Sequence, residues 1–207
     1  MLAPALTTLP AAAGQLHDRW RRVAESDGAA VAVLIWAVSE ATLQPIAPDL
    51  ALGLLALGTR RRLPRLLLAA VAGMALGGIC TVLAAEAAPV AATAVLLHLP
   101  LATPHGLTEA GAYLHSHGIA GGFVHQPWSG ISFKVWAVDA GAAHLDPRSV
   151  IPWFVAGRAV RFAVVTAAAA AIAALLDRAH LLRTAFPVVA TIGLAFFTLI
   201  LSRVASS

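Results

Sequence analysis

The chain has 207 residues, of which 59% are hydrophobic and only 12% are charged. Because an ordinary soluble domain carries about 25% charged residues, this composition argues against a soluble protein and predicts an all-α integral membrane protein. The net charge of +4 is the balance of 14 basic and 10 acidic residues. The basic residues cluster at the ends of apolar segments, as the positive-inside rule expects, so we expect no nucleic-acid partner.

The N-terminal 28 residues are predicted to form a tail and an interfacial helix. Residues 1–14 are rich in Ala, Pro and Thr and lack a basic start, so we expect loose order and no cleavable signal peptide. Residues 15–27 are charged and carry Leu16, Trp20 and Val23 at helical spacing. This pattern predicts an amphipathic helix whose arginines lie at the level of the lipid headgroups; a solvated helix is the alternative.

The apolar run 29–58 is interrupted by two acids and two prolines: Glu40, Pro45, Pro48 and Asp49. A carboxylate in hydrocarbon costs roughly 2.5–3.5 kcal/mol on insertion scales, and a proline inside a helix costs about 3 kcal/mol. Irregular backbone survives in a bilayer only where it faces protein or water. Each half has about ten residues, or about 15 Å of helix, which is half of a roughly 30 Å hydrocarbon core. We therefore predict a re-entrant hairpin, with a kinked full span as the alternative.

A dense basic loop at 59–65 precedes the clearest transmembrane helix. The loop holds four arginines and should therefore be cytoplasmic. Residues 66–85 contain no charge, and a helix of this length spans about 30 Å. Gly73, Gly77 and Gly78 form a stripe of small residues, which lets another helix approach closely.

The middle of the chain is apolar but interrupted. We place 86–103, a marginal apolar stretch, and 105–117, which is more polar, at the opposite interface. Five of the eight histidines fall between His98 and His125. No cysteine or HExxH pattern accompanies them, so we expect interfacial histidines, no metal site and no cofactor.

A second broken segment follows at 118–143. Its first half is glycine-rich and contains Pro127, and its second half, 131–143, is apolar and carries Lys134 and Asp139. We predict a second re-entrant hairpin here. Lys134 and Asp139 are five residues apart and so lie on different helix faces; we expect Asp139 to pair with an arginine or to lie beside an aqueous cleft.

Two further apolar helices complete the chain. Residues 150–176 are apolar except around Arg158 and Arg161, and 184–201 form the last span. The basic loop 177–183 lies between them and should be cytoplasmic. We therefore expect about three full transmembrane helices.

Each half of the chain holds a broken apolar segment, a charged turn and then a full helix, which makes a weak inverted repeat. Paired short segments interrupted by Gly and Pro point to a transporter-like site at the midplane of the bilayer. The basic loops place the N-terminus and residues 59–65 and 177–183 on the cytoplasmic side of the membrane; we expect this membrane to be a bacterial inner membrane. The predicted domains are 1–28, a membrane domain at 29–176, and 177–207.

Four charged residues lie at membrane depth: Glu40, Asp49, Arg158 and Arg161. An isolated charge there is too costly, so we expect the acids of the first broken segment to pair with the arginines. The arginines are three residues apart and share one helix face, where two guanidinium groups can clamp a phosphate bidentately. An acid that burial neutralises can carry a proton.

The same residues admit a structural interpretation, in which a static ion-pair network fixes how the hairpin docks. We favour a working site because prolines in the broken segments add cost without adding packing. A membrane-embedded enzyme is the third alternative. The sequence contains no GxSxG, no Gly-rich phosphate loop and no clear nucleophile–base pair, so we expect the chain not to be an enzyme.

Two blocks of residues resemble the DedA family of membrane proteins, whose domain is also called VTT or SNARE-associated Golgi, and in particular its YqaA-like branch. One block, 39–49, is similar to the family's motif of acid, Pro-x-x-Pro and acid. The other resembles an aromatic-Lys-Val-aromatic segment at 133–136, followed by a Gly-Arg-x-x-Arg-Phe helix start at 157–162. The resemblance covers about residues 30–176. The chain departs from the family pattern in lacking a second proline before the lysine.

This resemblance implies two facing re-entrant loops around a lipid-accessible cavity. It implies movement of a phospholipid or a polyprenyl-phosphate lipid between leaflets, driven by protons in bacterial members. Membrane lipids and protons are then the partners, a homo-oligomer is left open, and a non-transporting scaffold is the main alternative. The expected site has three groups: phosphate-binding Arg158, Arg161 and Lys134; proton-carrying Glu40, Asp49 and Asp139; and loop-shaping Pro45, Pro48, Pro127 and Gly157.

Overall fold

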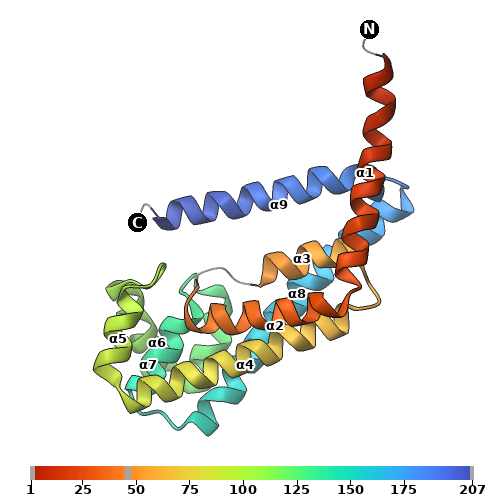
Figure 1. Ribbon diagram of the computed structural model, residues 1–207. Helices are drawn as coiled ribbons and strands as arrows, with labels where there is room; N and C mark the ends of the chain where they lie inside the picture. Colours follow the sequence, from red (N-terminus) through yellow and green to blue (C-terminus); the bar gives the residue numbers. More distant parts are fainter. Residues whose placement is uncertain (1–2, 45–47, 206–207) are drawn as a thin grey trace. The chain divides into compact units, whose positions relative to one another are not determined.

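The computed structural model describes residues 3–44 and 48–205, with side chains described for 12–44, 48–195, 198–199 and 202. In this part of the chain every regular element is helical: nine α-helices, α1–α9, and one 3-10 helix, η1 (Figure 1). The predicted all-α class is therefore confirmed for the described residues. The helices divide into two compact units. We name them the terminal unit (Met1–Ala32, Asp49–Leu67 and Ala163–Ser207) and the central unit (Val33–Pro48 and Leu68–Phe162).

The terminal unit is built around α1 (Ala3–Ala24), which packs against α3 (Asp49–Gly58) and α9 (Leu182–Ala205). Helix α1 begins at Ala3, so the loose order predicted for residues 1–14 is wrong from that residue on. Pro4 is compatible with this start because it lies in the first helical turn, where its missing N–H is not needed.

The inward face of α1 differs from the predicted apolar stripe. Leu16 and Val23 are about half exposed, at 48% and 51%. The residues turned toward the rest of the unit are His17, which is buried, and Trp20, whose indole N–H donates to the Leu54 carbonyl oxygen at 2.7 Å. An indole offers both apolar area and a hydrogen-bond donor, so this face of α1 can pack against the rest of the terminal unit without being purely aliphatic.

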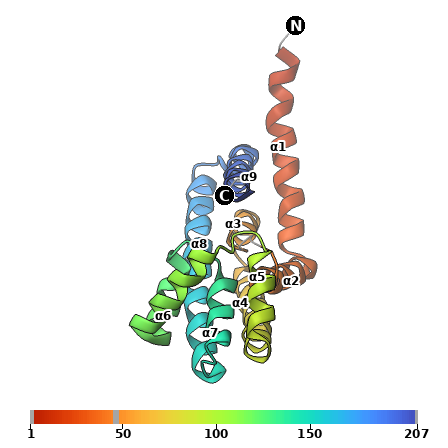
Figure 2. The ribbon, with the colours of Figure 1, turned by 90° about the vertical axis from the view of Figure 1, so that its left-hand side faces the viewer.

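The central unit is a bundle in which the ten-residue helix α7 is almost completely enclosed. Its elements are α2 (Asp27–Thr42) from Val33 on, α4 (Leu63–Ala87) from Leu68 on, α5 (Pro89–Leu97), α6 (Pro104–His125), η1 (Gln126–Trp128), α7 (Phe133–Ala142) and α8 (Pro147–Arg178) up to Phe162. Helix α7 lies between α5 and α6 (Figure 2). Every residue from Phe133 to Val138 is buried. The half-length helix predicted within 131–143 is thus confirmed.

Two of the three glycines in the predicted stripe on α4, Gly73 and Gly77, face α2, whereas Gly78 faces Phe154 and Phe133. A Cβ atom at Gly73 would lie 2.3 Å from the Leu34 carbonyl oxygen, and one at Gly77 would lie 2.7 Å from the Val38 carbonyl oxygen. Such distances leave no room for a methyl group. Close approach also lets the Thr81 hydroxyl on α4 donate to the Ala41 carbonyl oxygen of α2 at 2.9 Å.

The first break in the apolar run comes later than predicted. Helix α2 continues to Thr42, so Glu40 lies in its last helical turns and not in a loop. An acidic residue does not by itself end a helix, whereas a proline disfavours the helical conformation of the residue before it. Residues 45–47 lie outside the described part of the chain. The Gln44 side chain folds back along α2 and donates to the Trp36 carbonyl oxygen at 3.2 Å.

The second broken segment contains two backbone irregularities. Gly118 interrupts α6 with φ +70° and ψ 176°, and Gly130 precedes α7 with φ +76°. Positive φ values are accessible to glycine at little cost because glycine lacks a Cβ atom. The glycine-rich patch therefore does bend the chain, and short helical pieces lie on either side of η1.

Within the described part of the chain, two helices are long and apolar enough to cross a membrane: α4 (Leu63–Ala87) and α8 (Pro147–Arg178). Both keep large apolar side chains on the outside; Leu68 on α4 is 69% exposed and Leu175 on α8 is 64% exposed. Water would oppose this exposure and a lipid environment would not. The third predicted span, 184–201, falls within α9, but part of it lies outside the residues whose side chains are described.

Candidate charged site in the central unit

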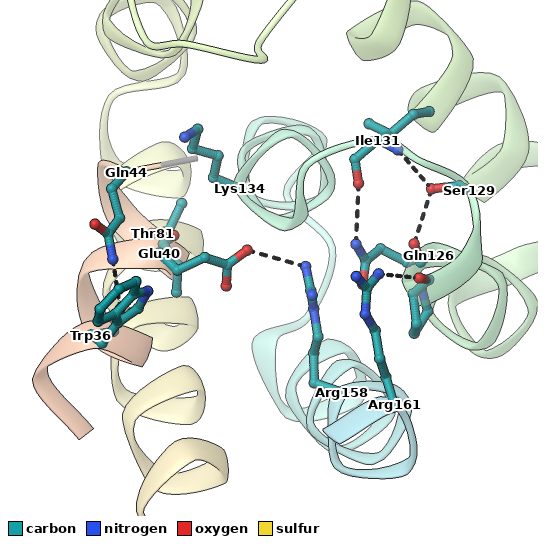
Figure 3. A network of polar contacts seen from close by, with 12 residues as sticks. Trp36, Glu40, Gln44, Thr81, Gln126, Ser129, Ile131, Lys134, Arg158 and Arg161 are labelled. Atoms are coloured by element: carbon teal, nitrogen blue, oxygen red, sulfur yellow. Dashed lines mark hydrogen bonds and ion pairs between the residues drawn. The ribbon is translucent and has the colours of Figure 1, made fainter. Parts of the chain in front are cut away.

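The core of the candidate site is a buried ion pair between α2 and α8. Arg158 Nη2 lies 3.4 Å from Glu40 Oε1, and the two side chains are only 3% and 4% exposed (Figure 3). The pairing expected between an acid of the first broken segment and an arginine of the later helix is confirmed for these two residues. A buried pair of this kind loses much of its hydration, which only good geometry and further contacts can offset.

Aromatic packing and a glycine hold Arg158 in place. A Cβ atom at Gly157 would lie 2.5 Å from the Phe123 carbonyl oxygen, so α8 approaches the end of α6 very closely at this point. The Arg158 guanidinium lies over the Phe133 ring, 5.2 Å from its centroid, and that ring packs edge-on against Phe154. Cation–π contacts of this type stabilise a guanidinium that has left water. Gly157, predicted to shape the loop, thus sets the helix packing that places Arg158.

Lys134 joins the pair from α7. Its side chain is completely buried, and its ammonium group donates to the Leu43 carbonyl oxygen at 3.1 Å. Its side chain also interacts electrostatically with Glu40. Lys134 therefore ties the buried helix α7 to the end of α2 and is a second basic residue near Glu40.

Arg161 lies next to Arg158 on α8 but has a different partner in the central unit. Its Nη1 donates to the Pro127 carbonyl oxygen of η1 (Figure 3). The loop that carries this carbonyl is held by Gln126, whose amide donates to the Ile131 carbonyl oxygen at 3.3 Å. The two arginines are neighbours, as their spacing predicts, yet within this unit one is directed toward Glu40 and the other toward the loop before α7.

Asp139 stands apart from this group. It lies on the part of α7 that faces α6, where a Cβ atom at Gly111 would be 3.0 Å from its Oδ1. Among the described residues the Asp139 carboxylate makes no hydrogen bond or ion pair, so the expected pairing with an arginine is not found there. The five-residue spacing from Lys134 explains the separation, because it puts the two side chains on different faces of one helix.

The remaining predicted residues are only partly covered. Asp49 begins α3 and belongs to the terminal unit, and its pairing with Arg158 or Arg161 stays a prediction. Pro45 lies outside the described residues, and Pro48 is buried. Two contributors to the site were not predicted: Gln44 and Gln126. A polar amide inside an apolar stretch was the available signal for both, but the carbonyl oxygens they bond have no signature in a sequence.

Comparison with protein-family models, with curated proteins and with solved structures finds no match to this chain. The resemblance to the DedA family therefore stays a hypothesis that rests on the order of the motifs.

The chemistry that the site can perform follows from the charged groups of its residues. One carboxylate, one ammonium and two guanidinium groups gather among short and broken helices, an arrangement that can hold an oxyanion and move a proton.

Proposed function

We propose that the chain is a DedA-like membrane transporter that moves a phospholipid or a polyprenyl-phosphate lipid between the two leaflets of a bacterial inner membrane. The observation that carries this proposal is the buried Glu40–Arg158 pair with Lys134 beside it. Ionisable groups at this depth in a membrane protein are costly and mark substrate or ion pathways more often than they serve packing.

The proposed mechanism is an exchange of one oxyanion for another on the arginine. In the resting protein the Glu40 carboxylate contacts Arg158. A lipid phosphate that enters the site competes with the carboxylate for this guanidinium, because carboxylate and phosphate both accept the planar pair of N–H bonds that a guanidinium donates. A proton taken up by Glu40 removes the negative charge of the carboxylate and leaves Arg158 to the phosphate; loss of that proton reverses the exchange.

The other predicted residues have supporting roles in this proposal. Lys134 and Arg161 add positive charge for the phosphate, and the lipid tails stay in the bilayer. Asp49 and Asp139 are further candidates for proton transfer. Helices α3 and α7, each too short to cross the hydrocarbon core, serve as the inner parts of two re-entrant hairpins. Whether protons drive the movement or only accompany it is decided by the transport experiment.

A non-transporting scaffold is the competing function. Its support is the very low exposure of the Glu40 and Arg158 side chains, which suits a static lock between α2 and α8. A lock predicts that transport activity is absent and that neutral substitutions at the pair affect only folding. A membrane-embedded enzyme, the third alternative, predicts turnover of lipid headgroups by the purified protein.

Reconstitution in liposomes tests the proposal. Fluorescent phospholipids are placed in one leaflet, and their appearance in the other is followed with and without a pH gradient. The proposal predicts that the wild-type chain accelerates exchange and that Glu40→Gln reduces the rate at least tenfold at equal incorporation. If the rate of leaflet exchange is the same in liposomes with and without the wild-type protein, the proposed transport is excluded for the lipids tested.

A further inference from the structure

A small cavity in the terminal unit has no part in the site described above. Its volume is about 250 Å³, and all of its lining residues belong to the terminal unit. It opens between α1, the loop that follows α3, and the junction of α8 and α9. Its charged and titratable lining comprises His17, Arg21, Glu25, Arg60, Arg61 and Asp177.

His17 is a buried polar group that the chain leaves unsatisfied. Its side chain is 9% exposed, and neither ring nitrogen has a hydrogen-bond partner among the described residues. The nearest carboxylate oxygen, on Asp18, lies 3.7 Å from Nδ1 and accepts a hydrogen bond from Arg183. A neutral imidazole needs one donor and one acceptor, and buried polar groups are nearly always satisfied by protein or water. His17 therefore has capacity for a polar partner from within the cavity that it lines.

The charges around the cavity favour an anion. Arg60 is held by Asp177, with an N–O distance of 3.4 Å. Arg21 and Arg61 make no ion pair with any residue in the described part of the chain. Glu25 is then the one remaining acid of the lining, so two guanidinium groups and an imidazole face a single carboxylate. Guanidinium groups donate paired N–H bonds that match the oxygens of a phosphate.

The cavity lies where phosphate is abundant around a membrane protein. The terminal unit contains the first residues of α4 and the last residues of α8, and both of these helices are long and apolar enough to span a membrane. The Arg60–Asp177 contact joins the loop before α4 to the end of α8, so the cavity is at the same end of both helices. Sites for drug-sized ligands are about 300–1,000 Å³; this smaller cavity fits a headgroup and not a whole lipid.

We propose that this cavity binds a phosphate group through Arg21 and Arg61, with His17 as the third contact. The phosphate belongs either to the headgroup of an anionic lipid at the membrane surface or to a small soluble phosphate. Its binding links α1 to the loop after α3, because Arg21 is on the first and Arg61 on the second. This site does not depend on the transport function proposed for Glu40 and Arg158.

The test is binding of two probes to the purified full-length protein in a non-ionic detergent. Inorganic phosphate and a short-chain phosphatidylglycerol are each titrated by calorimetry in phosphate-free buffer. The double variant Arg21→Gln/Arg61→Gln should lose at least tenfold in affinity. The matched control is Arg19→Gln/Arg22→Gln, which removes the same charge from positions of α1 outside the cavity and should change affinity less than threefold.

Four results decide the proposal. Tighter binding of the lipid than of inorganic phosphate supports it with a lipid headgroup as the source, and equal binding supports it with the phosphate alone. No binding of either probe to the wild-type protein overturns it. Equal losses in the two double variants also overturn it, because they indicate diffuse surface attraction. All variants are first compared with the wild type by size-exclusion chromatography and thermal unfolding.

A second variant covers the role of the imidazole. His17→Phe keeps a ring against Phe186, whose centroid is 5.4 Å from that of His17, and removes both nitrogens. Affinity for the phosphate probes should fall at least threefold while the protein stays folded. An unchanged affinity would remove His17 from the site.

Discussion

Arg158 Nη2 and Glu40 Oε1 lie 3.4 Å apart in a buried setting, although 118 residues separate them in the sequence. The contact joins the end of α2 to the middle of α8, and Lys134 on α7 interacts electrostatically with the same carboxylate. Three helices that are distant along the chain are therefore coupled through one charged group. The stability and the proposed function of the central unit both depend on it.

Breaking this pair from one side should be costly. Glu40→Gln or Arg158→Gln alone leaves a buried charge without its counter-charge, and each should lower the free energy of unfolding by about 3–5 kcal/mol. The double variant leaves neither charge without its partner, so its loss should be smaller than that of either single variant. Unfolding in detergent followed by tryptophan fluorescence gives all three values. Strictly additive losses would show that the two residues do not interact.

The approach of α2 to α4 predicts a sharp difference between two glycines. Gly73→Ala brings a Cβ atom to 2.3 Å from the Leu34 carbonyl oxygen, so the helices must separate, at a cost of about 1–3 kcal/mol. Gly53→Ala is the matched control, because its Cβ atom would meet Ala169 at 3.9 Å. There the better helix propensity of alanine, about 1 kcal/mol, should act alone. A lower unfolding temperature for Gly53→Ala than for Gly73→Ala would contradict the close packing of α2 against α4.

The proposed phosphate role of Arg158 depends on the shape of the guanidinium. Arg158→Lys keeps the positive charge but removes the planar pair of donors, and lipid exchange in liposomes should fall at least tenfold. Arg148→Lys is the control on the same helix, because Arg148 lies at the start of α8, away from the buried pair. Its exchange rate should equal that of the wild type. Wild-type exchange by Arg158→Lys at equal incorporation would count against bidentate phosphate binding.

The Arg60–Asp177 contact predicts that the two basic loops share one side of the membrane. In a background that lacks the single cysteine, Cys80→Ala, the variants Arg61→Cys and Ala179→Cys should both react with a membrane-impermeant maleimide from the cytoplasmic side. His105→Cys should react from the other side, as its predicted place at the opposite interface requires. Labelling of the two loop positions from opposite sides would contradict the Arg60–Asp177 contact.

Much of this architecture could be predicted from residue types. The charge-free run 66–85 identifies α4, and its glycines correctly indicate close helix packing. The Glu40–Arg158 pairing follows from the cost of an isolated charge in an apolar surrounding. These predictions succeed because each depends on one strong physical effect that is visible along the chain.

Other features could not be predicted because they depend on partners without a sequence signature. Arg161 and Lys134 both bond backbone carbonyl oxygens, and any residue can supply these. The inward face of α1 is set by His17 and Trp20 and not by Leu16 and Val23, since an indole that finds an acceptor competes well with aliphatic side chains. The end of α2 shifts past Glu40 because proline, and not charge, ends a helix.

The most direct measurement of the central claim is lipid exchange by the double variant Glu40→Gln/Arg158→Gln. Replacing both members of the pair by neutral residues leaves neither charge without its partner, so this variant separates a working site from a lock. At incorporation and thermal stability matched to the wild type, the transporter function predicts a loss of at least tenfold in the rate of leaflet exchange. Exchange at the wild-type rate would contradict it and leave the pair as a structural lock.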